Sequence, residues 1–368
     1  MEKQYSIDSN GFSKDDYEFF VIVGDVGGSN SYFAVLGVKS KKDFDIIVKY
    51  SIETSKVGKV YEVMNTILGD VKLEYDIEVN RCCIGAAGPV SRRRGYIKLT
   101  NIDLEIRVQE IMDNTMLNKV ILINDFEAIG YGIDLIDMEK DVVKIDHVGE
   151  DLTGGWTREN VYAVLGAGAG LGVSVVYYDN DTYLHAPLPS EGGHMDLIIH
   201  DKFDMEFAEY LKKNYLEKKD VHPEFERVLS GQGMELLYEF IRSKKKRNET
   251  VVSEKIKTLK GIPKLREIEK NYDKDPVCKE TVEKLINYFG RAARIIALMS
   301  ECYSGLFITG NVVMNNINLF KDGLFMKEFE KHDKRSDVLR KIPVYAIKNK
   351  DVSLYGCCNV ATNFYNIV

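Results

Sequence analysis

A glycine-rich stretch between two apolar runs places the strongest constraint on how this chain folds. Residues 23–38 read VGDVGGSNSYFAVLGV, in which Asp25, two adjacent glycines, Ser29 and Asn30 separate runs rich in β-branched and aromatic residues. A two-residue hairpin turn needs only a pair such as Asn-Gly, so this stretch holds more glycine than turning requires. The apolar run after the glycines predicts a second strand, whereas the phosphate loops of P-loop and dinucleotide-binding proteins open a helix. The sequence therefore predicts a β-hairpin here.

The extra glycine and the acid in this hairpin allow two interpretations. Glycines let backbone N–H groups approach an anion closely, and a neighbouring carboxylate can hold Mg²⁺ through water. The functional interpretation is a cradle for phosphate and Mg²⁺, formed by Asp25, Gly27, Gly28, Ser29 and Asn30. The alternative is a tight structural turn.

A second stretch, LGAGAGLG at 165–172, repeats this chemistry in the other half of the chain. Glycines at alternate positions, Gly166, Gly168 and Gly170, direct several N–H groups toward one side. Two such turns, each between predicted strands and one in each half, predict a nucleotide held between two domains.

The order of apolar patterns predicts an α/β fold with mixed sheets. Residues 19–53 contain three strand-like runs, after which helical and strand patterns alternate, and the pattern restarts near residue 135. Residues 104–118 are predicted to form one helix. Residues 280–304 form a longer apolar-striped helix, which Gly305 is expected to terminate as a C-cap.

Composition excludes several classes of protein. The 368 residues carry a net charge of −7, which argues against a nucleic-acid-binding surface, and 45% of them are hydrophobic. Six cysteines occur without C-x-x-C spacing, so a zinc cluster is not expected. No apolar run approaches the ~20 residues of a membrane span, and the N-terminal residues do not resemble a signal peptide. We expect a soluble, cytoplasmic protein that binds neither nucleic acid nor membrane.

Further candidate residues follow buried strands or lie among glycines. Asp125 comes directly after the apolar run KVILI, where it would accept the proton of an attacking hydroxyl group or simply cap the next helix. Glu191 and His194, in PSEGGHMDL, could hydrogen-bond a polyol, although a single histidine is often structural. Glu226, in FERVLSGQG, is by itself equally compatible with a surface charge.

Taken together, these segments resemble a known family. GDVGGSN, INDFEAIGYGI, LGAGAGLGVSVV, PSEGGHMDL, ERVLSGQG and GLFITGN occur in the order seen in bacterial-type ATP-dependent glucokinases. That family belongs to the sugar kinase, Hsp70 and actin superfamily with ribonuclease H-like domains. The resemblance runs from about residue 20 to about residue 362 and so covers nearly the whole chain.

The resemblance implies a fold, an activity and a set of site residues. The fold would be a two-domain actin-like ATPase, with a small domain at 1–134 plus 349–368, a large domain at 135–348 and a central cleft. ATP and Mg²⁺ would serve to phosphorylate the 6-hydroxyl group of glucose, with Asp125 as the base. Glucose would contact Asn101, Asn124, Asp125, Glu191, His194 and Glu226. The nucleotide would contact the two glycine turns, including Ala169, and the adenosine would lie beside Gly310 and Asn311.

Some residues depart from the family pattern. Ala169 replaces a usual threonine, and Asn311 stands where a second glycine is common. The alternatives are therefore a kinase for another hexose (mannose, fructose or glucosamine) and a sugar-binding sensor without catalysis. The family often forms homodimers, and we expect the same here, with a place in glycolysis.

Overall fold

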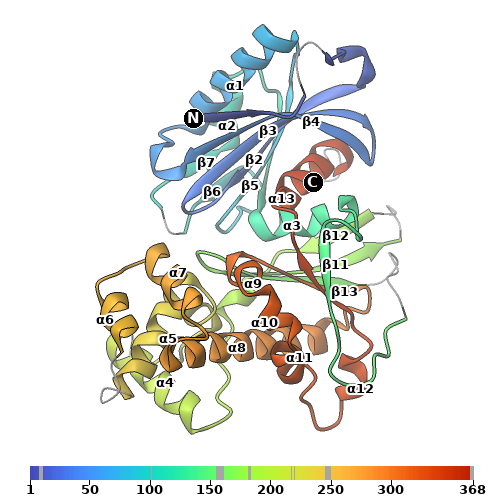
Figure 1. The fold of residues 1–368 in the computed structure, drawn as a ribbon. Helices are drawn as coiled ribbons and strands as arrows, with labels where there is room; N and C mark the ends of the chain where they lie inside the picture. The colour runs from blue at the N-terminus through green and yellow to red at the C-terminus, as the bar shows by residue number, and fades with distance from the viewer. Residues whose placement is uncertain are drawn as a thin grey trace. The chain divides into compact units, whose positions relative to one another are not determined.

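The computed structural model describes residues 1–7, 11–100, 102–154, 161–180, 184–216, 218, 220–244 and 250–364. The chain divides into two compact units (Figure 1). Unit 1 comprises Met1–Asp137, His185–Pro189 and Asn349–Val368, and unit 2 comprises Met138–Leu184 and Ser190–Lys348. The domain bounds expected from the sequence remain a prediction.

A mixed sheet forms the centre of unit 1. Its strand order is β1-β4-β3-β2-β5-β8, and the strands are β1 (Glu2–Tyr5), β2 (Phe19–Val26), β3 (Asn30–Ser40), β4 (Asp43–Glu53), β5 (Arg81–Ala86) and β8 (Lys119–Asn124). The predicted strands at 19–53 form as an antiparallel meander, while β5 and β8 run parallel to β2. The carboxyl ends of β2, β5 and β8 therefore meet at one edge of the sheet.

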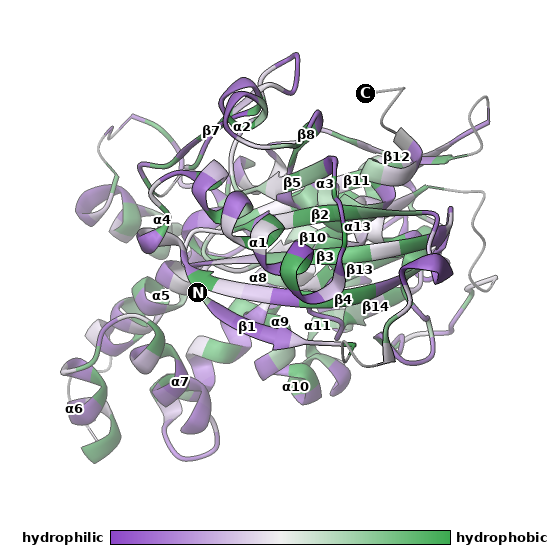
Figure 2. Cartoon of the chain, turned by 90° about the horizontal axis from the view of Figure 1, so that it is seen from above, coloured by the Kyte–Doolittle hydropathy of each residue, from purple (hydrophilic) through white to green (hydrophobic). Residues whose placement is uncertain are grey.

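Helices cover both faces of the unit 1 sheet (Figure 1). One face packs against α1 (Val60–Tyr75) and α2 (Val108–Asn114), and the other against α3 (Asp125–Gly132) and α13 (Val352–Asn359), which continues as a π-helix to Phe364. Hydrophilic (purple) and hydrophobic (green) residues alternate along helix α1 in Figure 2, as expected for a helix that buries one side. Glycines allow α3 and α13 to cross closely, since a Cβ built on Gly356 would meet the carbonyl oxygen of Ala128 at 1.7 Å.

The prediction of one helix at 104–118 was wrong. Residues Glu105–Arg107 form a strand, β7, which pairs with β6 (Tyr96–Lys98), and the helix begins only at Val108. Ile106 is buried opposite Ile97 in this small hairpin, so tertiary pairing decides its conformation.

Unit 2 is also built on a mixed sheet. The order of its strands is β11-β10-β13-β14-β9, with β9 (Val142–Ile145), β10 (Tyr162–Ala167), β11 (Leu171–Asp179), β13 (Gly305–Thr309) and β14 (Val344–Ile347). Strand β10 is antiparallel to β11 and parallel to β13. Strand β12 (Leu184–Leu188) lies mostly in the segment counted with unit 1.

Helices make up most of the rest of unit 2. They are α4 (Lys202–Asn214), α5 (Gly231–Lys244), α6 (Val251–Lys257), α7 (Ile262–Lys270), α8 (Pro276–Ser300), α9 (Asn311–Asn315), α10 (Ile317–Lys321), α11 (Leu324–Phe329) and α12 (Ser336–Leu339). The expected C-cap of the long helix was wrong. Helix α8 ends at Ser300, because Glu301 adopts a left-handed conformation (φ +47°), and Gly305 instead begins β13.

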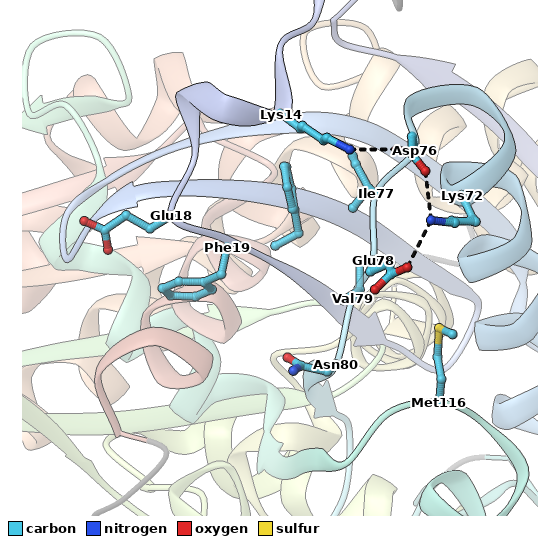
Figure 3. A pocket seen from close by; sticks show the side chains of 11 residues that line it. Lys14, Glu18, Phe19, Lys72, Asp76, Ile77, Glu78, Val79, Asn80 and Met116 are labelled. Atoms are coloured by element: carbon cyan, nitrogen blue, oxygen red, sulfur yellow. Dashed lines mark hydrogen bonds and ion pairs between the residues drawn. The ribbon is translucent and has the colours of Figure 1, made fainter.

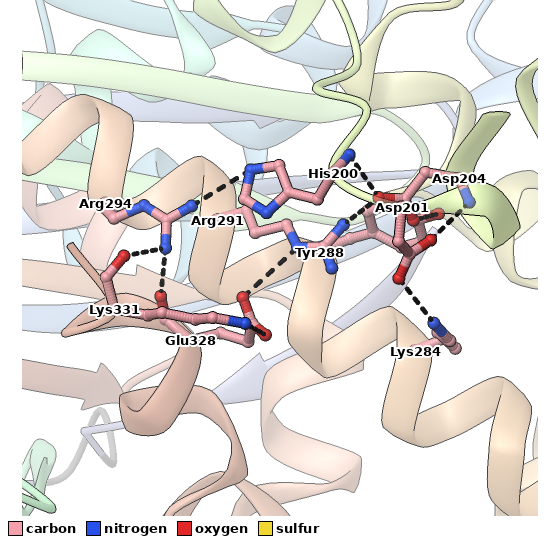
Figure 4. Close-up of polar contacts among 9 residues, drawn as sticks. All are labelled: His200, Asp201, Asp204, Lys284, Tyr288, Arg291, Arg294, Glu328 and Lys331. Atoms are coloured by element: carbon pink, nitrogen blue, oxygen red, sulfur yellow. Dashed lines mark hydrogen bonds and ion pairs between the residues drawn. The ribbon is translucent and has the colours of Figure 1, made fainter. Parts of the chain in front are cut away.

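A buried polar network joins α4, α8 and α11 within unit 2 (Figure 4). The Asp204 carboxylate accepts hydrogen bonds from Tyr288 Oη, Arg291 Nη1 and the His200 backbone N–H, at 2.7, 2.7 and 2.8 Å. Arg294 Nη1 donates to the carbonyl oxygens of Glu328 and Lys331, both at 2.7 Å. The buried Asp204 is therefore paired with Arg291, while backbone carbonyl oxygens accept the hydrogen bonds of Arg294, so each buried charge has polar partners.

No helix within the described ranges combines the length and apolar content needed to cross a membrane. Strand β2, by contrast, is largely hydrophobic (Figure 2), and most of its residues are buried within unit 1.

Candidate active site

The two acids predicted for unit 1, Asp25 and Asp125, lie at the carboxyl edge of its sheet. Asp25 is the seventh residue of β2, and Asn124 ends β8 and pairs in register with Ala86 of β5. Asp125 follows at once as the first residue of α3. Ligands of open α/β sheets bind at this edge, and both predicted acids of unit 1 lie there; their roles stay predictions.

Asp25 is held by a partner that lies far away in the sequence. Its Oδ2 accepts a hydrogen bond from Ser353 Oγ at 2.5 Å, and Ser353 is in the first turn of α13. Burial raises the pKa of the Asp25 carboxyl, while this hydrogen bond acts in the opposite direction. Sequence reasoning missed Ser353, because no local pattern connects residues that are more than 300 positions apart.

The glycine turn after Asp25 is held in shape by Thr54. Gly27 N–H donates to the Asn30 carbonyl oxygen at 3.2 Å, which closes the turn. Thr54 Oγ1 donates to the Gly27 carbonyl oxygen at 2.8 Å, and Thr54 N–H donates to that of Ser29 at 3.0 Å. These contacts engage the carbonyl oxygens of the turn. Ser29 and Asn30 are exposed, and Gly27 and Gly28 are partly exposed.

The helix-capping role considered for Asp125 belongs to Asn124. Asn124 Oδ1 accepts from the Phe126 N–H at 2.8 Å, and its Nδ2 donates to the Gly88 carbonyl oxygen at 3.3 Å. Glu127 Oε2 accepts from the Asn124 N–H at 2.9 Å, which completes a capping box. Asn124 therefore positions Asp125 through the helix start.

Arg94 fixes Glu127 on its other side. Its guanidinium donates two parallel hydrogen bonds to the Glu127 carboxylate, at 3.0 and 3.1 Å, and Glu127 is buried. Arg94 lies in the stretch SRRRGY, and its contact with Glu127 gives this stretch a structural role at the start of α3. The asparagine and glutamate of the capping box, three residues apart, were the sequence signal that could have identified Glu127.

Asp125 has a pKa suited to proton transfer at neutral pH. Burial raises the pKa of its carboxyl from 3.8 to about 7, and the nearby charge of Asp25 acts in the same direction. Hydrogen bonds from the start of α3 and from Asn124 oppose this shift only in part. A general base works best when its pKa lies near the working pH.

In unit 2 the second glycine turn connects β10 to β11, with Gly166 inside β10. Gly168 N–H donates to the Gly170 carbonyl oxygen at 2.8 Å, and Ala169 is exposed at the tip. A Cβ built on Gly168 would meet no heavy atom of the described residues within 4 Å. This glycine is therefore not required by packing here, which leaves room for a ligand to approach the backbone.

Gly310 and Asn311 lie beside that turn. A Cβ on Gly310 would meet the Ala167 carbonyl oxygen at 2.0 Å, and its φ of +101° also favours glycine. Asn311 is exposed at the start of α9. Because β10 and β13 are parallel, these residues share the carboxyl edge of the unit 2 sheet with the turn.

The predicted sugar-binding residues of unit 2 also come together. His194 Nδ1 lies 3.0 Å from Glu224 Oε2, and His194 Nε2 lies 3.8 Å from Glu191 Oε2. Glu226 Oε2 accepts from the Leu171 N–H at 2.9 Å, which ties this carboxylate to the glycine turn. Sequence reasoning missed Glu224, although it lies only two residues before Glu226.

Three of these side chains have the donor set of a metal site. His194, Glu224 and Glu226 offer ligand atoms within 4.8 Å of one another. However, Glu224 already hydrogen-bonds His194, and Glu226 the Leu171 backbone. The expectation that Asp25 holds Mg²⁺ stays a prediction, and its carboxylate likewise already accepts a hydrogen bond, from Ser353.

Two features fall outside these clusters. Asn101, predicted to border the sugar, lies outside the described residues. A cavity of about 610 Å³ in unit 1 lies at the opposite end of the strands, where β2 and β5 begin, and ion pairs joining Lys14, Asp76, Lys72 and Glu78 cross it (Figure 3). It contains none of the predicted site residues.

Solved structures share this architecture. Glucokinase from an Antarctic psychrotroph superimposes with a TM-score of 0.74 at 24% identity, covering 94% of this chain and 99% of the other. Glucokinase from Balamuthia mandrillaris, solved with glucose, gives a TM-score of 0.78 at 18% identity, covering 93% of each chain. The predicted fold class, an α/β protein of the actin-like ATPase type, is confirmed.

Sequence comparison then assigns the family. The chain belongs to the glucokinase family, whose model matches residues 22–364. A glucokinase of Trichormus variabilis is 27% identical over 350 residues, covering 91% of this chain and 97% of the relative. One of Mesorhizobium japonicum is 27% identical over 347 residues, covering 94% and 92%. The resemblance to a kinase family that the motifs indicated is confirmed.

Proposed function

We propose that this protein transfers the γ-phosphoryl group of ATP to the 6-hydroxyl group of D-glucose, with Asp125 as the general base. The observation that carries the proposal is the pKa of Asp125, which is raised to about 7. Asn124 caps the helix in place of Asp125, so the Asp125 carboxyl is not needed as the cap. The family assignment and the glucokinases named among its relatives support glucose as the substrate.

The residues of unit 1 supply the base and a phosphate site. Asp125 accepts the proton of the sugar hydroxyl as the phosphoryl group arrives, and Asn124 orients it through the start of α3. Asp25 is a carboxylate of the kind that holds Mg²⁺ through water, and the N–H groups of the adjacent turn suit phosphate oxygens. Mg²⁺, when bound, would neutralise charge on the phosphates.

The residues of unit 2 supply sugar contacts and further phosphate contacts. Glu191, His194 and Glu226 are carboxylate and imidazole groups, which suit the neutral hydroxyl groups of a sugar. The turn at 168–170 exposes backbone beside Gly310 and Asn311, where we propose that the phosphates and the adenosine bind. Phosphoryl transfer asks a protein mainly for positioning and charge stabilisation, which these groups provide.

The experiment is ADP release with ATP, Mg²⁺ and a panel of hexoses, comparing wild type with Asp125→Asn. We expect glucose-dependent turnover that falls by about 100-fold or more in the variant. Asp113→Asn, an exposed acid on α2, is the matched control and should leave turnover unchanged.

Three other results would change the conclusion. Turnover with another hexose in place of glucose would keep the mechanism and change the substrate. Glucose binding without turnover of any sugar would identify a sensor on a kinase fold. Full activity of Asp125→Asn would refute its role as the base.

A further inference from the structure

We propose that Glu224 is a positioning residue of the sugar site, which holds His194 so that its Nε2–H donates a hydrogen bond to a hydroxyl oxygen of the sugar. The inference rests on the proposed function, because it assigns a role within the same site. It begins from one contact: His194 Nδ1 lies 3.0 Å from Glu224 Oε2. An ionised carboxylate only accepts hydrogen bonds, so the proton of this contact is on Nδ1.

The fold keeps Glu224 beside His194. The Phe225 N–H donates to the Met195 carbonyl oxygen at 2.9 Å, and the Leu197 N–H donates to that of Pro223 at 2.8 Å. Glu224 forms an antiparallel bridge with Asp196 between these two bonds. Phe225 is fully buried, which anchors the segment. Backbone pairing therefore keeps the two residues side by side, although the His194 side chain itself is exposed and that of Glu224 is half-buried.

The charges around His194 favour its protonated form. Glu191 comes from its own segment, with Oε2 3.8 Å from Nε2, and Glu224 and Glu226 come from the segment that pairs with it. Arg227 Nε lies 3.6 Å from the other oxygen of Glu224, and β11 packs against the histidine turn through apolar Leu171 and Val173. Partial burial lowers the pKa of His194, but the hydrogen bond and charge of Glu224, helped by Glu226 and Glu191, raise it overall.

A protonated imidazole complements the neighbouring carboxylates in binding a polyol. Glu191 and Glu226 can only accept hydrogen bonds from sugar hydroxyl groups, whereas doubly protonated His194 can only donate to a hydroxyl oxygen. A donor that carries charge makes a stronger hydrogen bond than a neutral one. Glu224 uses its oxygens on His194 and Arg227, so it acts on the sugar through the histidine.

The test is the pH dependence of KM for glucose in wild type and in Glu224→Gln, from pH 5.5 to 8.5. Glutamine keeps the size and an accepting oxygen but removes the charge, so His194 loses its proton at lower pH. At pH 7.5 we expect KM to rise about five- to tenfold, with kcat changed less than about twofold. The difference should shrink at the acidic end of this range, because protonation of His194 depends less on Glu224 as pH falls. Glu209→Gln, an exposed acid on α4, should behave as wild type.

A second measurement does not depend on activity. NMR titration of ¹⁵N-histidine-labelled protein, with His194→Gln to assign the resonance, should give a lower pKa for His194 in Glu224→Gln than in wild type. An unchanged pKa would overturn the proposal. So would wild-type phosphorylation of glucose with the same pH dependence of KM in both proteins, which would leave the proposed function intact. If neither protein binds or phosphorylates any hexose, the proposed function fails, and this proposal with it.

Discussion

Replacing Asp125 with asparagine should make the protein more stable at alkaline pH while it removes the proposed general base. The Asp125 carboxyl ionises near pH 7 in the folded protein and near pH 4 in the unfolded chain, because burial disfavours its charge. Because the pKa of Asp125 is higher in the folded protein than in the unfolded chain, its carboxyl makes its full contribution to the free energy of unfolding below pH 4. That stability is lost as pH rises toward 7, and the loss stays constant above pH 7.

The size of the effect follows from the two pKa values. The difference between 3.8 and about 7 corresponds to about 4 kcal/mol of unfolding free energy at pH 8. Asp125 is partly exposed, so water screens some of this cost, and we expect asparagine to recover about 2–4 kcal/mol. At pH 5.5 the gain should be about half as large, because the folded carboxyl still keeps its proton there.

Differential scanning calorimetry of wild type and variant at pH 5.5 and 8.0 measures this gain. For a unit of this size we expect the transition of unit 1 to rise by about 5–10 °C at pH 8.0. Asp113→Asn should not change it. Every other ionisable group is common to both proteins, so the difference reports Asp125 together with its charge coupling to Asp25. A variant that is less stable at pH 8.0, or a gain independent of pH, would refute the burial argument.

Three further predictions concern other parts of the structure. Asp25→Asn removes a charge that raises the pKa of Asp125. In the pH profile of the residual kcat/KM, the acid limb, near pH 7 in wild type, should therefore shift to lower pH. An acid limb that does not shift would contradict the coupling between the two carboxyl groups. Arg291→Met leaves the buried Asp204 carboxylate without its guanidinium partner, and should lower the free energy of unfolding, measured by thermal unfolding, by about 3–5 kcal/mol. A loss below about 1 kcal/mol would mean that the pair is dispensable. Gly310→Ala places a Cβ 2.0 Å from a backbone carbonyl oxygen at φ +101°, so it should raise KM for ATP more than KM for glucose in steady-state assays. Gly69→Ala, on a helix and with no heavy atom within 4 Å of the added Cβ, is the control and should change neither value. Equal rises of both KM values in Gly310→Ala would argue against a nucleotide role for Gly310.

Local patterns predicted several elements well. The strands within residues 19–53 form as expected, because alternating apolar residues and turn-forming glycines act over a few positions. The end of α8 was predicted less well, since Glu301 takes the left-handed conformation that the sequence favours at Gly305. Residues 105–107 joined a hairpin because Ile106 has a buried partner across it.

In the candidate site, too, local motifs indicated some residues, while others are set by contacts between distant parts of the chain. Motif order indicated the family and drew attention to Asp25, Asp125, His194 and Glu226, because glycine turns and acids after strands are local signals. The proposed site also depends on partners that lie elsewhere in the chain. Ser353 donates to Asp25, Arg94 pairs with Glu127, and Glu224 pairs with His194.

The sequence by itself determined the fold class, the family and most of the candidate residues, because strand periodicity, turn chemistry and motif order are written in short stretches. Only the tertiary structure decided how the pKa values of Asp25, Asp125 and His194 shift, and which groups hold these residues. A pKa near 7 for Asp125 arises from burial and from a second acid, Asp25 on β2. Burial and charge proximity depend on the folded chain, since residues distant in sequence become neighbours only when the sheets and helices pack.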